Sequence, residues 1–236
     1  MEKFITYENL RYFAYSNDHI CEKPIRGILM DFWGMNSTGM YHEDPETGIF
    51  FAQQGILYLI PYYNPWAFCN RQTVNLIDEI LDVVYAHFGQ LPLVFMGNSM
   101  GGLTALSCTV LSRHRCVACL ANCPACDMAD HIFDRPDLPH ALYSAFGGYD
   151  GTLEEAMLTV SPLHLIDRMP DIPYTVFCGM EDTVVNKAKH SDAFVQAMKK
   201  SHNITYYEIP GMGHCKMPED VKQTYFRLAA DAVLNA

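Results

Sequence analysis

The sequence has little positive charge and no long apolar run. Lysine and arginine together number 16 against 27 aspartates and glutamates, which gives a formal net charge of -11 at pH 7. Nucleic acids and anionic membranes favour basic patches, and no apolar stretch here reaches the length that spans a bilayer. We therefore expect no nucleic-acid partner and no membrane partner.

The chain also lacks the features that separate domains. We find no low-complexity segment, no internal repeat and no linker rich in proline, glycine and serine among its 236 residues. Hydrophobic residues make up 50 % of the chain, which is enough for a substantial core. The expected organisation is therefore a single domain over residues 1–236.

A signal peptide is not expected either. The N-terminal segment MEKFITYENLRYFAYSND has no basic start followed by an apolar block and a small-residue cleavage site. Cysteine, by contrast, is not scarce: there are 9, and most lie inside apolar runs such as VFCGM and LSCTV. This pattern is typical of reduced, buried thiols rather than of a secreted disulfide scaffold, so we expect a cytoplasmic protein.

Short apolar runs alternate with longer amphipathic ones along the chain. FITYE and RYFAYS predict a paired edge hairpin, and further strands are expected at RGILMDFW, GILYLIPY, LPLVFMG, RCVACLANC, IPYTVFCGM and NITYYEIPG. Helices are expected near 46–54, in TVNLIDEILDVVYAHF, from the serine of SMGGL onward, and over 186–200 and 218–235. The alternation predicts an α/β fold with a mostly parallel sheet of about eight strands and helices on both faces.

One serine has almost no side chains of any size around it. Residues 97–101 read G-N-S-M-G, with a buried strand before and a helix after Ser99. This is the G-x-S-x-G pattern of a nucleophile elbow, in which a strained strand-to-helix turn lifts the serine hydroxyl clear of the sheet. The residues two positions either side must then be small, as Gly97 and Gly101 are. Ser99 is therefore the predicted nucleophile.

A serine nucleophile needs a base and an acid that orients the base. Among 10 histidines, His214 alone lies on a glycine-flanked loop, PGMGHCK, that follows a strand and precedes the last helix. Asp182 follows the strand TVFCG and is the predicted acid, with its neighbour Glu181 and, at a second strand end, Asp127 as alternatives. The chain order Ser, Asp, His is the order expected when such a triad sits on an α/β sheet.

The elbow, GMEDTVV and GMGH together resemble the α/β-hydrolase superfamily, and specifically its small bacterial esterases related to the prolyl-oligopeptidase-like serine peptidases. The resemblance implies an α/β-hydrolase fold from the strand at 26–32 to the last helix. The chain departs from that pattern twice: many relatives have His-Gly where Asp31 and Phe32 stand, and a histidine where Asn98 stands.

The resemblance also implies an oxyanion hole made of two backbone N–H groups. The first is that of Met100, directly after the nucleophile. Aligning D-F-W-G with the family's H-G-x-G makes Trp33 the second donor, with Phe32 or Gly34 as alternatives.

Aromatic residues suggest where a substrate is bound. The segment IPYYNPWAFCN supplies Tyr62, Tyr63 and Trp66, which either line a substrate pocket or cover the sheet edge. Residues 127–160 occupy the place where α/β hydrolases insert a cap, and they are predicted to form a small helical flap. The expected substrate-binding residues are Phe32, Tyr62, Tyr63, Trp66, Phe133, Tyr143 and Phe146.

The run CVACLANCPAC resembles a metal-binding pattern, with cysteines spaced C-x2-C-x3-C-x2-C. Its intervening residues are apolar and it falls on a predicted strand, where Cys116 and Cys119 are expected to point to opposite faces. We therefore expect no metal site and no cofactor.

The sequence thus predicts a serine hydrolase that cleaves small to medium acyl or aromatic carboxylic esters through an acyl-enzyme. A peptidase or a thioesterase with the same triad is the alternative, and a non-catalytic binding protein of the same fold is a third hypothesis. No G-x-G-x-x-G follows the first strand, which argues against a hydride-transfer enzyme.

Overall fold

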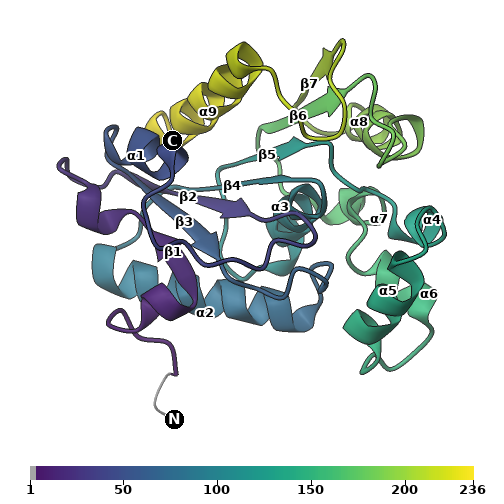
Figure 1. The fold of residues 1–236 in the computed structure, drawn as a ribbon, viewed down its shortest axis with the longest axis horizontal. Coiled ribbons are helices and arrows are strands. Elements are labelled where there is room, and N and C mark those ends of the chain that lie inside the picture. The colour runs from purple at the N-terminus through teal and green to yellow at the C-terminus, as the bar shows by residue number, and fades with distance from the viewer. Residues whose placement is uncertain (1–3) are drawn as a thin grey trace.

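The computed structural model describes residues 4–236, and a single sheet runs through their centre (Figure 1). Within the described residues the sheet has seven strands in the order β1-β3-β2-β4-β5-β6-β7. The strands are β1 Ala14–Ser16, β2 Gly27–Phe32, β3 Ile56–Pro61, β4 Leu93–Asn98, β5 Ala118–Asn122, β6 Tyr174–Gly179 and β7 Ile204–Ile209. Of these seven, only β1 runs antiparallel to its neighbour.

Helices connect the parallel strands and cover both faces of the sheet. They are α1 Glu46–Ala52, α2 Arg71–Phe88, α3 Met100–Leu111, α4 Met128–His131, α5 Leu138–Phe146, α6 Leu153–Leu158, α7 Pro162–Leu165, α8 Ala193–Met198 and α9 Glu219–Leu234. None of the helices described is long and apolar enough to cross a membrane. The predicted architecture, a mostly parallel sheet between two helical layers, is confirmed.

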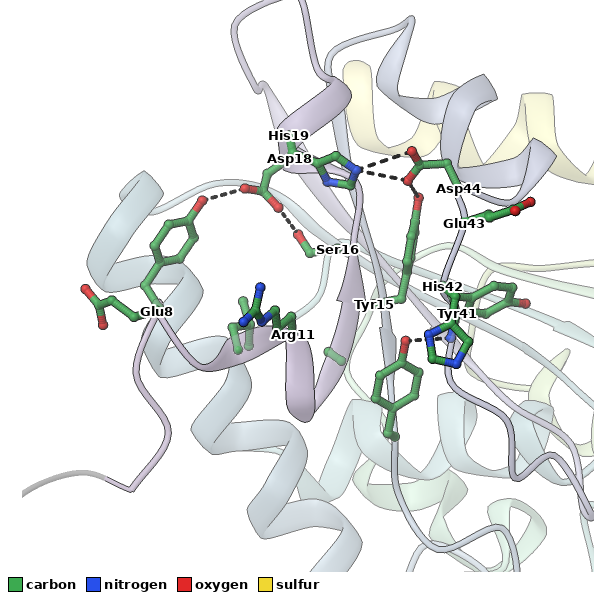
Figure 2. Close-up of a pocket in the computed structure, with 14 residues that line it drawn as sticks. Glu8, Arg11, Tyr15, Ser16, Asp18, His19, Tyr41, His42, Glu43 and Asp44 are labelled. Atoms are coloured by element: carbon green, nitrogen blue, oxygen red, sulfur yellow. Dashed lines mark hydrogen bonds and ion pairs between the residues drawn. The ribbon is translucent and has the colours of Figure 1, made fainter.

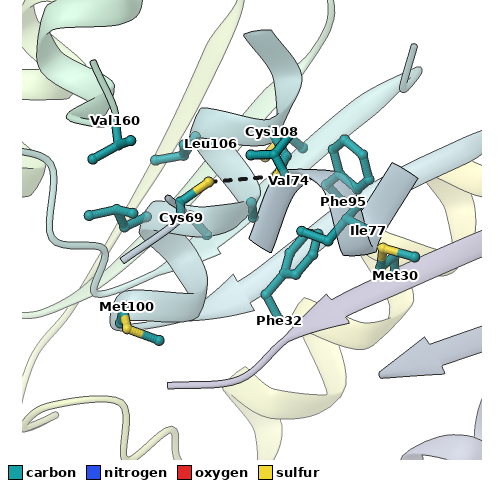
Figure 3. Packing of buried hydrophobic residues seen from close by; sticks show 14 of the residues in the cluster. Met30, Phe32, Cys69, Val74, Ile77, Phe95, Met100, Leu106, Cys108 and Val160 are labelled. Atoms are coloured by element: carbon teal, nitrogen blue, oxygen red, sulfur yellow. Dashed lines mark hydrogen bonds between the residues drawn. The ribbon is translucent and has the colours of Figure 1, made fainter. Parts of the chain in front are cut away.

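The two faces of the sheet carry separate hydrophobic clusters. On one face, α2 and α3 pack on β2 and β4, where Phe32, Phe95 and Ile77 are buried together (Figure 3). On the other face, Phe51 of α1 and Tyr225 of α9 pack on the opposite side of the same strands. Period-2 alternation along each strand therefore sends side chains into both layers, which is why these strands are apolar throughout.

The N-terminal hairpin predicted from FITYE and RYFAYS is wrong. Within its described part only Ala14–Ser16 is a strand, and Leu10–Tyr12 forms a 3-10 turn. The side chain of Asn9 accepts a hydrogen bond from the backbone N–H of Thr6 at 2.8 Å, which favours a turn over a strand. The sheet consequently has seven described strands rather than about eight.

The strand order places a switch point between β2 and β4. From β2 the chain proceeds to β3 on one side, and from β4 it proceeds to β5, β6 and β7 on the other. Loops that leave the carboxyl ends of strands at such a point diverge and open a crevice. Ser99 follows β4 at this point, and Trp33 follows β2.

Gly101 brings α3 against the end of β2. A Cβ atom built on it would collide with the carbonyl group of Phe32 and lie 2.8 Å from the carbonyl oxygen of Trp33. Both obstacles are backbone atoms of a strand end, so they cannot rotate away as a side chain would. Glycine is therefore required where α3 crosses β2.

We predict that Gly101→Ala lowers the free energy of unfolding by about 1–3 kcal/mol, because the added methyl group overpacks this contact. Urea denaturation followed by circular dichroism measures the change. Gly148→Ala is the matched control, since Gly148 is exposed and a methyl group added there would meet no atom within 4 Å. Equal denaturation midpoints for the two variants would contradict the requirement for glycine at 101.

Candidate active site

Ser99 sits at a sharp turn between β4 and α3. Its backbone has φ 58° and ψ -121°, a conformation that residues other than glycine rarely adopt. A Cβ atom on Gly97 would collide with the carbonyl group of Gly101, so the turn closes only because residue 97 is glycine. The backbone N–H of Ser99 donates to the carbonyl oxygen of Asn122 at 2.9 Å, which anchors the turn to β5.

His214 and Asp182 reach Ser99 from two other strand ends. His214 follows β7 and Asp182 follows β6. The Nε2 atom of His214 lies 2.8 Å from Ser99 Oγ, and its Nδ1 atom lies 2.7 Å from Asp182 Oδ2. The structure thus joins the three predicted residues in one hydrogen-bonded chain.

The two alternative acids do not take this place. Glu181 is exposed, and its backbone N–H donates to the carbonyl oxygen of Met212. The carboxylate of Asp127 accepts hydrogen bonds from the backbone N–H groups of Ala129 and Asp130 at the start of α4. Asp182 is therefore the carboxylate that contacts His214.

Gly179 lets the loops that carry Asp182 and His214 meet. A Cβ atom on Gly179, the last residue of β6, would collide with the carbonyl group of Met212 and lie 2.7 Å from the carbonyl oxygen of Gly213. The backbone of the His214 loop therefore rests directly on the end of β6. This close approach sets the distance between the carboxylate and the imidazole.

The environment of Asp182 keeps it ionised. Burial alone raises the pKa of Asp182, but hydrogen bonds from His214 and from the backbone N–H groups of Val185 and Val184 outweigh burial and lower it. The Val184 and Val185 N–H groups lie 2.9 and 3.0 Å from Oδ1, while the side chain is 0 % exposed. A buried carboxylate so bound can hold a proton on Nδ1 of His214.

His214 is a stronger base than a free histidine. Burial lowers its pKa, but hydrogen bonds with Asp182 and with Cys123 outweigh burial and raise the pKa from 6.5 to about 9. With Nδ1–H donating to Asp182, the Nε2 lone pair faces the Ser99 hydroxyl. The arrangement can therefore remove a proton from Ser99 as its oxygen attacks an electrophile.

Similarity to known proteins is found at the level of structure. No protein-family model and no curated protein sequence matches the chain. Esterase B from Lactobacillus rhamnosis is similar to it with a TM-score of 0.70 and 14 % identity, over 91 % of this chain and 78 % of that one. An S-formylglutathione hydrolase from Agrobacterium tumefaciens is similar with a TM-score of 0.72 and 16 % identity, over 93 % and 88 %.

A thermophilic esterase from the planctomycete Thermogutta terrifontis is similar with a TM-score of 0.69 and 21 % identity, over 94 % of this chain and 86 % of that one. In all three the likeness covers more than nine tenths of this chain. The chain has the α/β-hydrolase fold.

In this α/β-hydrolase fold the loop after β2 lies against the nucleophile turn. A Cβ atom on Gly34 would lie 3.7 Å from the Cβ atom of Ser99. The hydroxyl of Tyr63 donates to the carbonyl oxygen of Trp33 at 2.6 Å and so fixes one peptide of the loop. The predicted oxyanion donors, the N–H groups of Met100 and Trp33, thus belong to segments that flank Ser99, and their role stays a prediction.

A cavity of about 490 Å³ opens beside this loop. Its lining includes Trp33, Asn98, Asp31, Tyr58 and Phe226. The hydroxyl of Tyr58 donates to Oδ2 of Asp31 at 2.5 Å, whereas Oδ1 is buried without a hydrogen-bond partner among the described residues. Burial, opposed by the Tyr58 hydrogen bond, raises the pKa of Asp31 from 3.8 to about 7.

Asp31 was not among the residues predicted to bind substrate; in the sequence it marked only a departure from the family pattern. The available signal was a charged residue near the end of a strand that is otherwise apolar. A buried carboxylate with a free oxygen requires a polar partner or a proton. The cavity therefore presents one carboxyl group, and Asn98, the residue before Ser99, lines the same cavity.

The structure disperses the seven predicted substrate residues. Phe32 is 1 % exposed and Tyr63 is 6 % exposed, so both side chains are buried in the core. Phe133 and Tyr143 are 83 % and 69 % exposed. These positions do not form one apolar wall as expected.

Four of the seven line cavities, and one of the four is Phe32, which borders the cavity that Asp31 lines. Trp66 and Phe146 line a cavity of about 940 Å³ between the start of α2 and α5. Tyr62 lines a hollow at the β1 edge of the sheet, where its hydroxyl accepts a hydrogen bond from the backbone N–H of Tyr41. Its ring centroid lies 5.4 Å from that of Trp33. A substrate role for these residues remains a prediction.

The hollow at the β1 edge has a volume of about 660 Å³ (Figure 2). Several of its polar groups bind one another: Asp18 accepts from Ser16, and Asp44 contacts both Tyr15 and His19. These contacts do not join a nucleophile to a base and an acid. The hydrogen-bonded chain at Ser99 is the better candidate for an active site.

The pH dependence of this site follows from His214. Protonated His214 cannot accept the Ser99 proton, so kcat/KM for any substrate of Ser99 should rise with pH along a limb centred near 9. Asp182→Asn removes a hydrogen bond and a charge that raise the His214 pKa, so the limb should move to lower pH. The rate should also fall on the order of 10⁴-fold, because asparagine no longer holds the imidazole in the tautomer with its proton on Nδ1.

Initial rates measured across pH on wild type and Asp182→Asn test this expectation. Glu181→Gln is the matched control, because it neutralises the exposed neighbouring carboxylate and should leave the limb in place. A limb that stays at the same pH in Asp182→Asn would show that Asp182 does not set the basicity of His214.

Proposed function

We propose that the chain is a serine hydrolase that cleaves carboxylic esters through an acyl-enzyme. The observation that carries the proposal is the continuous chain from Ser99 Oγ to His214 at 2.8 Å and from His214 to Asp182 at 2.7 Å. Ser99 supplies the nucleophile, His214 the base, and Asp182 the carboxylate that orients the base. The solved structures of the same fold named above, two esterases and an S-formylglutathione hydrolase, support this choice of reaction.

The reaction proceeds in two halves. Ser99 Oγ attacks the ester carbonyl as His214 Nε2 takes the serine proton, and the N–H groups of Met100 and Trp33 stabilise the oxyanion. His214 then gives the proton to the leaving alcohol, and an acyl-Ser99 remains. In the second half His214 deprotonates a water molecule that attacks the acyl group and restores Ser99. Asp182 stabilises the imidazolium formed in each half.

Residues 127–160 are proposed to act as a small cap on a single catalytic domain. They contain α4, α5 and α6, which group together at one side of the molecule in Figure 1. Asp134 and Arg135 between these helices line a cavity of about 430 Å³ together with Asp182. The segment thus borders the loop that carries the acid of the triad, which supports a role in limiting access.

The proposed substrates are small to medium acyl or aromatic esters, and the proposed location is the cytoplasm. The cavity beside Ser99 combines the aromatic side chains of Trp33, Tyr58 and Phe226 with a single carboxyl group, Asp31. Thioesters use the same machinery and are the second candidate, which the likeness to an S-formylglutathione hydrolase favours. The resemblance to prolyl-oligopeptidase-like enzymes keeps peptide cleavage as a further hypothesis.

Substitution of the nucleophile tests the reaction itself. Ser99→Ala should lower the hydrolysis of p-nitrophenyl butyrate by at least about 10⁴-fold, because attack by Oγ is lost. A fluorophosphonate probe should label wild type at Ser99 with one equivalent and leave Ser99→Ala unlabelled. Ser201→Ala, at an exposed serine, should behave as wild type. If wild type cleaves no ester or thioester faster than Ser99→Ala, the proposal fails.

The carboxyl group of Asp31 predicts a selectivity that depends on pH. As the pH rises through about 7, Asp31 ionises and should repel an acyl chain that carries its own negative charge. The ratio of kcat/KM for p-nitrophenyl butyrate to that for p-nitrophenyl hemisuccinate should therefore be larger at pH 8 than at pH 6. In Asp31→Asn the ratio should become independent of pH. An equal change of the ratio with pH in the variant would remove Asp31 from substrate selection.

A further inference from the structure

A second set of reactive side chains lies beside Ser99. Ligand atoms of Cys123, His214 and Cys215 lie within 4.8 Å of one another. Cys123 follows β5, and Cys215 follows β7, so two distant segments of the chain supply the thiols. Cys123 is buried, whereas Cys215 is partly exposed and the His214 side chain is 18 % exposed. The group is therefore reachable from solvent at the mouth of the site.

Both thiols are held in place by unusual backbone geometry. Cys123 has φ 46° and Cys215 has φ 55°, in the region that favours glycine. The Cys215 thiol donates to the carbonyl oxygen of Asn122 at 3.8 Å, and the Cys123 thiol donates to Oδ1 of the same asparagine at 3.4 Å. Strained positions tend to occur where function fixes a side chain, and here two of them direct sulfur toward one imidazole.

The spacing fits a metal ion. Zinc binds thiolate sulfur at about 2.3 Å and histidine nitrogen at about 2.0–2.1 Å in a tetrahedron, so sulfur and nitrogen atoms that share a zinc lie about 3.6 Å apart. The Sγ atom of Cys215 lies 3.6 Å from His214 Nε2. This sulfur and this nitrogen are therefore already separated by the distance expected for two ligands of one zinc ion.

The tautomer of His214 fits as well. Its Nδ1–H donates to Asp182, which leaves the lone pair on Nε2. Histidines that bind zinc commonly donate their other N–H to a carboxylate in the same way. The contact that prepares His214 as a base therefore also prepares it as a metal ligand.

Residues 4–236 contain a second group of this kind, made of His131, Asp134 and His190. It lacks the free nitrogen lone pair that His214 offers. Nδ1 of His190 accepts hydrogen bonds from the backbone N–H groups of Cys126 at 3.2 Å and Asp127 at 3.1 Å. Its proton must then be on Nε2, which has no lone pair to offer. That group is not a metal site in this tautomer.

We propose that Cys123, His214 and Cys215 bind one zinc ion, or a similar thiophilic divalent cation, and that the bound ion reversibly inhibits the enzyme. The inhibition, though not the binding, rests on the proposed hydrolase function. Two S–Zn bonds and one N–Zn bond form, and the two thiols release their protons to solvent. The Nε2 lone pair is then used in the bond to zinc and cannot accept the Ser99 proton.

This site is not the one suggested by the cysteine run. Cys116 lies before β5 begins, and it packs with Cys119 in the same hydrophobic cluster, so the expectation that they point to opposite faces is wrong. Neither belongs to a group of three metal-ligating side chains among the described residues. Only Cys123 of the run contributes, together with ligands that come from the β7 loop.

Inhibition is measured with zinc chloride on ester hydrolysis, each variant being compared with its own rate without metal. Cys215→Ser and Cys123→Ser should each raise the zinc concentration for half-inhibition at least about tenfold, because a ligand is lost. Cys21→Ser is the matched control, since Cys21 is also partly exposed but contacts Asn17 and Ile56 at the start of β3. Magnesium should not inhibit, because it prefers oxygen ligands.

Binding is measured separately, without activity. Cadmium added to Ser99→Ala should give a thiolate-to-metal charge-transfer absorbance that saturates at one equivalent. The absorbance should be lost when Cys123→Ser or Cys215→Ser is added to Ser99→Ala and retained with Cys21→Ser, with circular dichroism confirming that each variant is folded. This readout stands even if the chain hydrolyses no ester, so failure of the proposed function is distinguishable.

Two outcomes would overturn the proposal. One is a charge-transfer band that is absent, or that survives the loss of both Cys123 and Cys215. The other is an active enzyme whose zinc sensitivity is the same in wild type, Cys215→Ser and Cys123→Ser.

Discussion

The backbone of Ser99 is held in a conformation that a free serine would avoid, and the rest of the site is built around that constraint. Such a conformation costs on the order of 1–3 kcal/mol, so it persists only where its surroundings fix it. Gly97 against Gly101, Gly101 against the end of β2, and the Ser99 N–H on Asn122 do so here. Gly179 adds a fourth backbone contact, which fixes the His214 loop on β6. Because rigid backbone contacts position the loops, the triad side chains need span only 2.7 and 2.8 Å.

Local sequence patterns predicted the features that depend on residues close together in the chain. Apolar strands, the amphipathic helix α2 and the glycines around Ser99 are each fixed by residues close in sequence. The chain order of Ser99, Asp182 and His214 then followed from parallel strands whose carboxyl ends share one edge. FITYE failed as a strand because a single side chain, Asn9, competed for a backbone N–H, a contact that hydrophobic patterning does not register.

Side-chain direction was harder to predict than strand position. Adjacent residues on β2 point to opposite faces, so the Phe32 side chain packs in the core although the residue borders the cavity, while Asp31 presents its carboxyl group there. Aromatic character alone favoured Phe32 and overlooked Asp31. Tyr63 illustrates a related difficulty: its ring is buried, yet its hydroxyl fixes the carbonyl of Trp33, so it acts on the loop after β2 without lining a pocket.

The approach of Cys123 and Cys215 to His214 could not be predicted from the sequence, because it depends on how the β5 and β7 loops meet. Once they meet, one lone pair on Nε2 is available to the Ser99 proton or to a metal ion, but not to both. Asp182 strengthens either interaction, since it stabilises positive charge on the imidazole and fixes its tautomer. Zinc therefore competes with the catalytic proton at a site that is already formed, and control of the enzyme by the metal requires no change of fold.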